Sequence, residues 1–196
     1  MFNGRIFENF LNKKDCEYLI HTAIDLSLWS NSDNEFWDNR LTQYHDILKH
    51  DKRAGEIMLD ANNRCKEKIK AEYSLQIPIY SDTLQIVRWF PGTEQPPHAD
   101  NMDFEGALEH DHKINKHRVF GSIIYLNSDY VGGNTYYPNF NFNIVPKSGS
   151  LAVHPADSKH LHGVTKIEDS IRYTIASFWT HDPLKCGFWN TVDYNK

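Results

Sequence analysis

The feature that most constrains the fold is a change of texture near Leu75. From there on the chain consists of short runs rich in β-branched and aromatic residues, separated by Pro, Gly, Asn and Asp. These runs lie at 84–90, 118–126, 134–138, 142–146, 150–154 and 171–179. No long helical pattern alternates with them, which disfavours a parallel, doubly wound sheet. We therefore expect an antiparallel sandwich or barrel in this half of the chain.

The chain before Leu75 has a helical period instead. The segment 13–27 carries apolar residues on one face, namely Cys16, Leu19, Ile20, Ala23 and Ile24, with Asn12 and Asp15 as an N-terminal cap. The segment 51–73 repeats apolar residues at four-residue intervals, namely Ile57, Ala61, Cys65 and Ile69, and should pack across a flat surface. Between these segments, 30–40 is polar and lacks a period, so we expect a loop there.

Composition narrows the partners and the compartment. The 196 residues carry a formal net charge of −5 without a block of Lys or Arg, which argues against nucleic acid and anionic membranes as partners. The opening residues lack a signal-peptide pattern, and no run approaches a membrane span, so we expect a soluble, cytoplasmic protein. Its 3 cysteines form no CxxC pair, which indicates buried thiols rather than a disulfide framework or a thiolate zinc site.

A metal site is suggested by His98-Ala99-Asp100. On extended backbone, residues two apart share a face, so this imidazole and this carboxylate can bind one ion. The tripeptide alone is weak evidence, because it arises often in a chain with 11 histidines. A third ligand on another strand would complete a set of two histidines and one carboxylate, which is typical of non-haem Fe(II) oxygenases and leaves coordination positions open. The candidates for that ligand are His154, His160 and His162.

An anion site is suggested by Arg172, which lies in the last β-rich run. Alternation along a strand puts Thr174, Ala176 and Phe178 on its face, and the small side chains leave room for an anion. A planar guanidinium suits a carboxylate bidentately, although a surface ion pair is the alternative. Phe178 and its neighbour Trp179 are candidates for lining a substrate pocket. Phe36 and Trp37 of the early loop either form part of a substrate groove or hold that loop against the core. The role of Arg88 stays open.

Seven segments then fall in a characteristic order: LQIVRWFPG at 84–92, HAD at 98–100, IIYLN at 123–127, GGNT at 132–135, VPKSGSLAVH at 145–154, HGV at 162–164, and Arg172. With this order the chain resembles the 2-oxoglutarate- and Fe(II)-dependent oxygenases, and within them the prolyl 4-hydroxylase-like group, over about residues 80–182. The resemblance implies an α+β, mainly β fold with a double-stranded β-helix (jelly roll) core. We expect a single domain, 1–196, made of a mainly helical part at 1–75, the core at 76–182 and a tail at 183–196.

The resemblance also assigns roles to individual residues. It makes His98, Asp100 and His162 the ligands of Fe(II), and Arg172 the partner of the distal carboxylate of 2-oxoglutarate. Many prolyl 4-hydroxylases have Lys at that position, and Arg keeps the charge while adding a bidentate fork.

Two further positions depart from the family pattern. Trp89 stands where the family often has a tyrosine that contacts the co-substrate, so Trp89 and Tyr125 are both candidates for that contact, and Tyr125 could supply the hydroxyl. Asn134 stands where the family often has Glu in the GGxT motif, and we expect the two glycines before it to form the turn between strands.

By this resemblance the protein hydroxylates a C–H bond, with 2-oxoglutarate and O2 as co-substrates and succinate and CO2 as products, and ascorbate commonly supports the reaction. The expected substrate is a peptidyl proline. A free amino acid or small metabolite is the alternative, and a non-catalytic jelly-roll binding module is a second one. The sequence leaves the substrate and the oligomeric state open.

Other histidines compete for a role. His110 and His112 would form a rival metal clip if extended, but their surroundings lack β-enrichment, so we expect the stretch 101–117 to be a loop that covers the substrate. His154 and His160 flank His162 in sequence, and we expect them near the metal without binding it.

Overall fold

The computed structural model describes residues 2–30, 35–102 and 115–187. Most of the loop expected at 101–117, with the His110 and His112 clip, lies outside the described residues.

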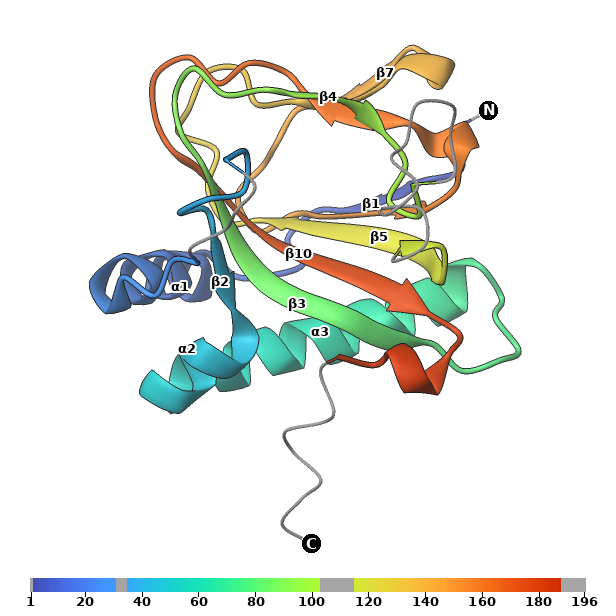
Figure 1. Cartoon of the computed structure of the whole chain (residues 1–196), viewed down its shortest axis with the longest axis horizontal. Coiled ribbons are helices and arrows are strands. Elements are labelled where there is room, and N and C mark those ends of the chain that lie inside the picture. Colours follow the sequence, from blue (N-terminus) through green and yellow to red (C-terminus); the bar gives the residue numbers. More distant parts are fainter. Residues whose placement is uncertain (1, 31–34, 103–114, 188–196) are drawn as a thin grey trace, which may run out of the picture.

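Two antiparallel sheets form the body of the described chain (Figure 1). The larger sheet has the order β1-β8-β5-β10-β3-β2, formed by Arg5–Phe7, Leu151–Pro155, Arg118–Tyr125, Arg172–Thr180, Tyr80–Trp89 and Leu41–Gln43. The smaller sheet has the order β4-β9-β6-β7, formed by Gln95–His98, His162–Val164, Thr135–Tyr137 and Phe142–Ile144. The sheets face each other, which confirms the expected jelly roll.

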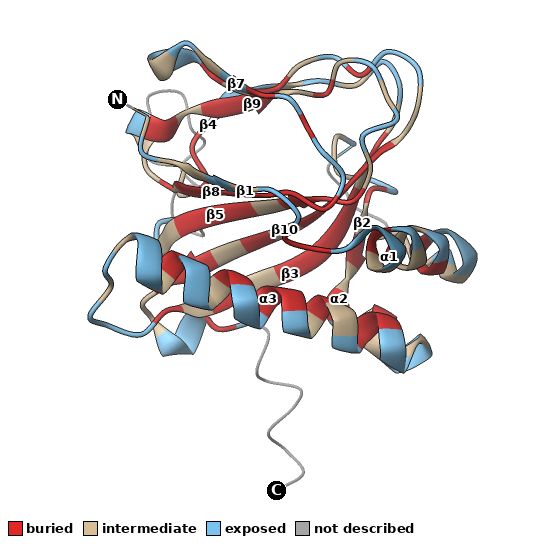
Figure 2. Ribbon diagram, turned by 180° about the vertical axis from the view of Figure 1, so that it is seen from behind, coloured by how far each residue is buried: buried red, intermediate tan, exposed pale blue. Residues whose placement is uncertain are grey.

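Three α-helices lie on the outer side of the larger sheet (Figure 2). They are α1 (Lys13–Leu26), α2 (Tyr44–His50) and α3 (Lys52–Glu72). Helix α3 runs across the sheet and buries Ala61, Cys65 and Ile69, as expected from their spacing, while Ile57 is half-buried. Among the described residues, no helix is both long and apolar enough to cross a membrane.

Helix α1 has the predicted cap, since the Asn12 side chain accepts a hydrogen bond from the Asp15 backbone N–H at 3.0 Å. Its predicted apolar face is wrong at one place, because Ile24 is 46% exposed. The face that packs on the core ends one position earlier, at Ala23. All three cysteines are buried thiols, as expected.

The core divides at the larger sheet. Its outer face and the helices share the main cluster, to which β10 contributes Tyr173, Ile175 and Trp179. Its inner face and the smaller sheet share two further clusters, one around Val87, Trp89 and Val164 and the other around Tyr125, Tyr137 and Ile144. Arg172 alternates with the main-cluster residues along β10, so it points between the sheets, as the period-2 pattern predicted.

The sequence patterns miss the shortest elements. β1, β2, β4 and β9 have three or four residues each, and α2 has seven, so none is long enough to show a period. Strand β4 also contains Pro96 and Pro97. Because prolines are rare within strands, the sequence pattern does not indicate a strand there. Among the described residues, β4 lies at the edge of the smaller sheet and pairs with β9 alone. Three short 3₁₀ helices complete the described elements, at Pro138–Phe140, Ser158–His160 and Pro183–Lys185.

The start of α3 generates a stability prediction. The Asp51 carboxylate caps the helix by accepting a hydrogen bond from the Ala54 N–H at 3.0 Å, and it also accepts bonds from the hydroxyls of Tyr18 at 2.9 Å and Thr22 at 3.3 Å. Burial raises the pKa of Asp51, but these hydrogen bonds outweigh it, so the pKa lies below 3.8. Replacing Asp51 by Ala should lower the free energy of unfolding by about 1–2 kcal/mol at neutral pH, measured by urea unfolding.

Because the folded-state pKa of Asp51 is depressed, its contribution is present above the unfolded pKa and disappears as the pH falls through the folded value. The difference between wild type and variant should therefore shrink at pH values below 3.8. Asp60 on the exposed side of α3 is the control, since it pairs only with Arg64 at 2.8 Å and its replacement by Ala should cost about 0.3–0.5 kcal/mol. Equal losses at both positions would contradict the capping role.

Candidate active site

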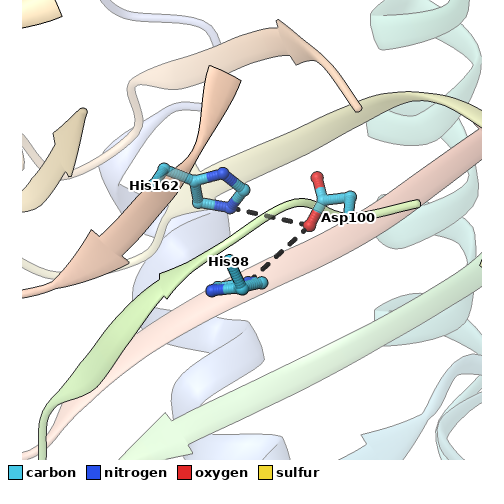
Figure 3. A group of neighbouring side chains, drawn as sticks. All are labelled: His98, Asp100 and His162. Atoms are coloured by element: carbon cyan, nitrogen blue, oxygen red, sulfur yellow. Dashed lines mark ion pairs between the residues drawn. The ribbon is translucent and has the colours of Figure 1, made fainter. Parts of the chain in front are cut away.

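His98, Asp100 and His162 offer ligand atoms that all lie within 4.8 Å of one another (Figure 3). His98 is the last residue of β4 and faces His162, the first residue of β9, across the antiparallel pair. Each ring donates its Nδ1 proton to a carbonyl, that of Pro96 at 3.2 Å for His98 and that of His160 at 3.1 Å for His162. The Nε2 atoms therefore keep their lone pairs and point at Asp100 Oδ1, at 3.9 Å from His98 and 3.5 Å from His162.

The reason given above for the meeting of His98 and Asp100 is wrong. Strand β4 ends at His98, so Asp100 is not on the same strand face but in the turn that follows. The turn is held by backbone hydrogen bonds from Met102 N–H to the Ala99 carbonyl at 2.9 Å and from Asn101 N–H to the Ala156 carbonyl at 3.1 Å. These bonds return the carboxylate toward the two imidazoles.

The turn also presses Asp100 against strand β5 at Gly121. A Cβ at this glycine would lie 1.9 Å from Asp100 Oδ2, which no real contact allows. Only a residue without a side chain lets the carboxylate approach the strand this closely. The Arg118 guanidinium, on the same strand, donates to the Asp100 carbonyl at 3.4 Å and to the Asp82 carboxylate at 2.8 Å.

The three groups have the protonation states that metal binding requires. Burial, with the neighbouring His162, lowers the pKa of His98 to about 4, and burial, with the neighbouring His154, lowers that of His162 to about 4. Burial raises the pKa of Asp100, but the surrounding imidazoles and Arg118 outweigh it and the net shift is downward. At neutral pH the site presents two neutral imidazoles and one carboxylate.

A divalent metal fits this arrangement. Among the described residues, the buried Asp100 Oδ2 has no hydrogen-bond partner, and neither His98 Nε2 nor His162 Nε2 forms a hydrogen bond. Two histidines and one carboxylate are the donor set of non-haem Fe(II) sites with open positions. In the part of the chain that the structure describes, no other group of three His, Cys, Asp or Glu side chains is arranged to hold an ion.

Arg172 begins β10, opposite Trp89 of β3, and is 1% exposed. Its Nη2 donates to Thr135 Oγ1 at 3.4 Å, and its Nε has no hydrogen-bond partner. None of the ion pairs among the described residues neutralises this charge, although a buried cation without an anion is costly. Gly133, at φ +62°, makes room for the side chain, because a Cβ there would lie 3.1 Å from Arg172 Cδ.

Further polar groups surround Arg172. Its guanidinium carbon lies 5.4 Å from the ring centres of both Trp89 and Tyr125. The Tyr125 hydroxyl shares a hydrogen bond of 2.7 Å with Thr135, and the buried Tyr130 hydroxyl lies beside Arg172, whereas Trp89 Nε1 is buried without a partner among the described residues. Buried polar groups are rarely left unpaired in a protein, so this cluster indicates the binding place of a polar ligand.

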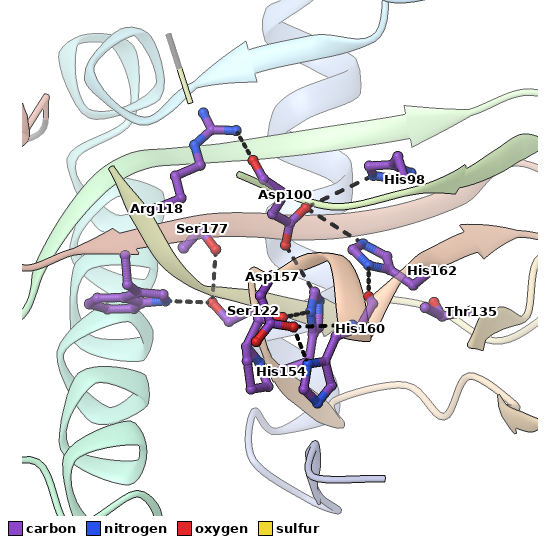
Figure 4. A network of polar contacts seen from close by, with 12 residues as sticks. His98, Asp100, Arg118, Ser122, Thr135, His154, Asp157, His160, His162 and Ser177 are labelled. Carbon is purple, nitrogen blue, oxygen red and sulfur yellow. Dashed lines mark hydrogen bonds and ion pairs between the residues drawn. The ribbon is translucent and has the colours of Figure 1, made fainter. Parts of the chain in front are cut away.

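Of the remaining candidate residues, His154 lies beside Asp100, whereas His160 and Trp179 have their partners elsewhere. His154 Nε2 lies 3.6 Å from Asp100 Oδ2, whereas the His160 ring turns away and bonds the Asp157 carboxylate at 2.6 Å (Figure 4). Trp179 lines no pocket, because it is fully buried on the helix side of β10 and donates to Ser122 at 2.9 Å. The Arg118 guanidinium covers the Phe178 ring, with its central carbon 3.8 Å from the ring centre.

The aromatic residues of the early loop lie beside the site. Phe36 and Trp37 pack edge-on against Trp89, with ring centres 5.9 and 5.6 Å apart from it. Arg88, whose role was open, lies on the other side of the sheet, where its guanidinium carbon is 3.9 Å from the ring centre of Trp29. Contacts with the larger sheet therefore exist on both sides of this loop, from Trp29 to Arg88 and from Phe36 and Trp37 to Trp89.

The sequence reasoning missed four residues of the site: Gly121, Tyr130, Gly133 and Thr135. A glycine within the apolar run RVFGSIIYL is a recognised signal of close approach to a strand, so Gly121 could have been found. Thr135 belongs to the GGNT segment but had been given no role. Gly132 and Gly133 have positive φ angles of +77° and +62°, but Gly132 forms an isolated β-bridge with Ile167 instead of the expected turn.

The contact at Gly121 makes a prediction. Replacing Gly121 by Ala should push the Asp100 carboxylate away from the two imidazoles, because the new methyl group would overlap Oδ2. We expect the affinity for Co(II), titrated anaerobically and followed by its visible absorption, to fall at least about 10-fold. Unchanged affinity in a folded variant would contradict the close packing of Asp100 on β5.

A family model described as the 2OG-Fe(II) oxygenase superfamily matches residues 84–181. A putative prolyl 4-hydroxylase of Acanthamoeba polyphaga mimivirus is 23% identical over 152 residues, which cover 76% of this chain and 58% of that protein. The chain spans about half the length of the relatives of this kind that it matches.

Two solved structures share the fold. One is the viral collagen prolyl hydroxylase of Paramecium Bursaria Chlorella virus-1 in its 2OG complex, with a TM-score of 0.66, 17% identity, and coverage of 91% of this chain and 95% of that chain. The other is a prolyl hydroxylase of Trichoplax adhaerens in complex with a hypoxia inducible factor peptide, with a TM-score of 0.66, 18% identity, and coverage of 91% and 84%.

Proposed function

The chain belongs to the 2OG-Fe(II) oxygenase superfamily, and we propose on this basis that it hydroxylates a C–H bond of a peptidyl proline, with release of succinate and CO2. The family uses Fe(II), 2-oxoglutarate and O2. The observation that carries the proposal is the combination of the His98, Asp100 and His162 group with a buried arginine that lacks an anion. A protein that only bound peptides would need neither.

We assign the metal to His98, Asp100 and His162. When bound, Fe(II) would let O2 act as the oxidant: one oxygen atom would go to the C–H bond and the other to 2-oxoglutarate, which leaves as succinate and CO2. The protein's own contribution is to fix three ligands on one side of the metal and leave the other side accessible. The two Nδ1 hydrogen bonds to backbone carbonyls hold the imidazole rings in orientation and keep Nε2 free as the donor atom.

We assign the distal carboxylate of 2-oxoglutarate to Arg172. A guanidinium presents a planar pair of N–H donors, and this one has Nε unpaired. The Thr135 hydroxyl and the neighbouring Tyr125 and Trp89 are the other groups placed to contact the same carboxylate. Packing of Trp89 under Phe36 and Trp37 excludes water from that side.

The peptide substrate is supported by the relatives. Both solved structures are prolyl hydroxylases, one described as a collagen prolyl hydroxylase and the other bound to a peptide. The alternative substrates are a free amino acid or a small metabolite, which would use the same chemistry at the same metal.

The test combines both substrate classes. Protein, Fe(II), ascorbate and 2-oxoglutarate are incubated in air with a panel of proline-rich peptides, and separately with free proline and a mixture of amino acids. Succinate is measured by NMR and the gain of one oxygen by mass spectrometry. Oxygen gained on a peptide supports the proposal, and gain on a free amino acid alone replaces it with the alternative. If the protein neither binds iron nor forms succinate, the proposal is wrong, and a non-catalytic jelly-roll binding module is the remaining interpretation.

The role of Arg172 makes a separate prediction. Replacing it by Met removes two charge-assisted hydrogen bonds to the co-substrate, so KM for 2-oxoglutarate should rise about 10- to 100-fold, whereas Lys should restore part of the loss. Steady-state kinetics with varied 2-oxoglutarate measures both, and Co(II) affinity should not change. Replacement of Arg64 by Met is the control, because that arginine lies on α3, on the outer side of the larger sheet, where it pairs with Asp60 at 2.8 Å, and its loss should leave KM unaltered.

A further inference from the structure

Two buried polar atoms without hydrogen-bond partners face each other beside the metal ligands. One is Asp100 Oδ2, the carboxylate oxygen that does not point at His98 and His162, and the other is His154 Nε2. They lie 3.6 Å apart, and His154 is 1% exposed (Figure 4). An unpaired carboxylate oxygen in the interior is costly, so a donor this close needs only a small movement to remove the cost.

The fold brings these two groups together over one glycine. His154 lies on β8 and pairs with Gly121 of β5, the residue on which Asp100 packs. A Cβ at Gly121 would lie 1.9 Å from Asp100 Oδ2 and 2.8 Å from His154 Cε1, so the missing side chain is what lets carboxylate and ring meet. The rings of Tyr137 and His162, at 5.6 and 4.2 Å from that of His154, fix its orientation.

The ring can donate toward Asp100. Its Nδ1 lies 3.2 Å from the carbonyl of Pro155, the next residue, so the two nitrogens compete for one proton in the neutral ring. A carboxylate is a stronger acceptor than a peptide carbonyl, and a hydrogen bond to it is about twice as strong. The proton therefore belongs on Nε2, between the ring and Asp100.

Resting on the proposed function, we propose that His154 is a positioning residue that donates Nε2–H to Asp100 Oδ2 and so holds Oδ1 toward His98 and His162. Without this hydrogen bond, the buried Oδ2 has no donor and the carboxylate is free to turn away from the two imidazoles. Loss of that orientation weakens metal binding. The histidine thus orients a ligand without touching the metal itself.

The test uses two replacements of His154. Phe keeps a ring of similar size but has no donor, whereas Gln places an N–H group near the position of Nε2. We expect the Phe variant to bind Co(II) 10- to 100-fold more weakly in anaerobic titrations, and the Gln variant to recover most of the affinity. The visible absorption of the anaerobic Fe(II) and 2-oxoglutarate complex should also change in the Phe variant, with Gln close to wild type.

A matched control separates positioning from stability. Val153 precedes His154 on β8 and lies in the main core cluster, on the other face of the sheet. Replacing Val153 by Ala should lower the melting temperature while leaving Co(II) affinity and the absorption of the 2-oxoglutarate complex unchanged. A loss of affinity in this control equal to that of the Phe variant would overturn the proposal.

The remaining outcomes are distinguishable. If wild type binds the metal and the Phe variant binds it equally well, or if Gln fails to recover affinity, the positioning role is wrong and the proposed function stands. If X-ray absorption counts three imidazoles on the metal in wild type and two in the Phe variant, His154 is itself a ligand and the proposal is overturned. If wild type binds no metal, the proposed function fails and this inference fails with it.

Discussion

The antiparallel pairing of β4 with β9 is the constraint on which the rest of the site depends. It sets His98 directly across from His162, with ring centres 4.5 Å apart, so the separation of two ligands follows from the spacing of two strands. The third ligand then needs only a tight turn after β4 to return to them. Both strands are short, and the larger sheet with its helices supplies the rigid body on which they are held.

The other half of the site is organised by small residues. Gly121 allows Asp100 to lie against β5, and Gly133 allows Arg172 to lie against the segment before β6. At each glycine, another side chain fills the space that a Cβ would occupy: Asp100 at Gly121 and Arg172 at Gly133. The interior therefore remains closely packed. The group formed by His98, Asp100 and His162 and the Arg172 side chain are linked across the space between the sheets by two rings of one cluster, Tyr137 beside His162 and Tyr125 beside Arg172.

The sequence predicted the long elements and the meeting of His98, Asp100 and His162, for different physical reasons. Helix α3 and strand β10 are long enough for their periods to appear, and β10 placed Arg172 on the correct face. The short strands carried no period, and His98 and Asp100 meet through a turn whose hydrogen bonds involve residues far apart in sequence, such as Asn101 and Ala156. The packing of Asp100 on Gly121 is likewise a tertiary contact that no local pattern contains.

Strand β4 has a consequence for how an extended peptide can approach. It is an edge strand, and edge strands normally offer unpaired backbone groups to which another strand can add. Two of its four residues are Pro96 and Pro97, which have no N–H to donate, so the edge cannot extend the smaller sheet by regular pairing. A peptide or a second copy of the protein that lies along β4 therefore cannot be held by a complete ladder of backbone hydrogen bonds, because the strand offers its carbonyls but N–H groups from at most two of its four residues.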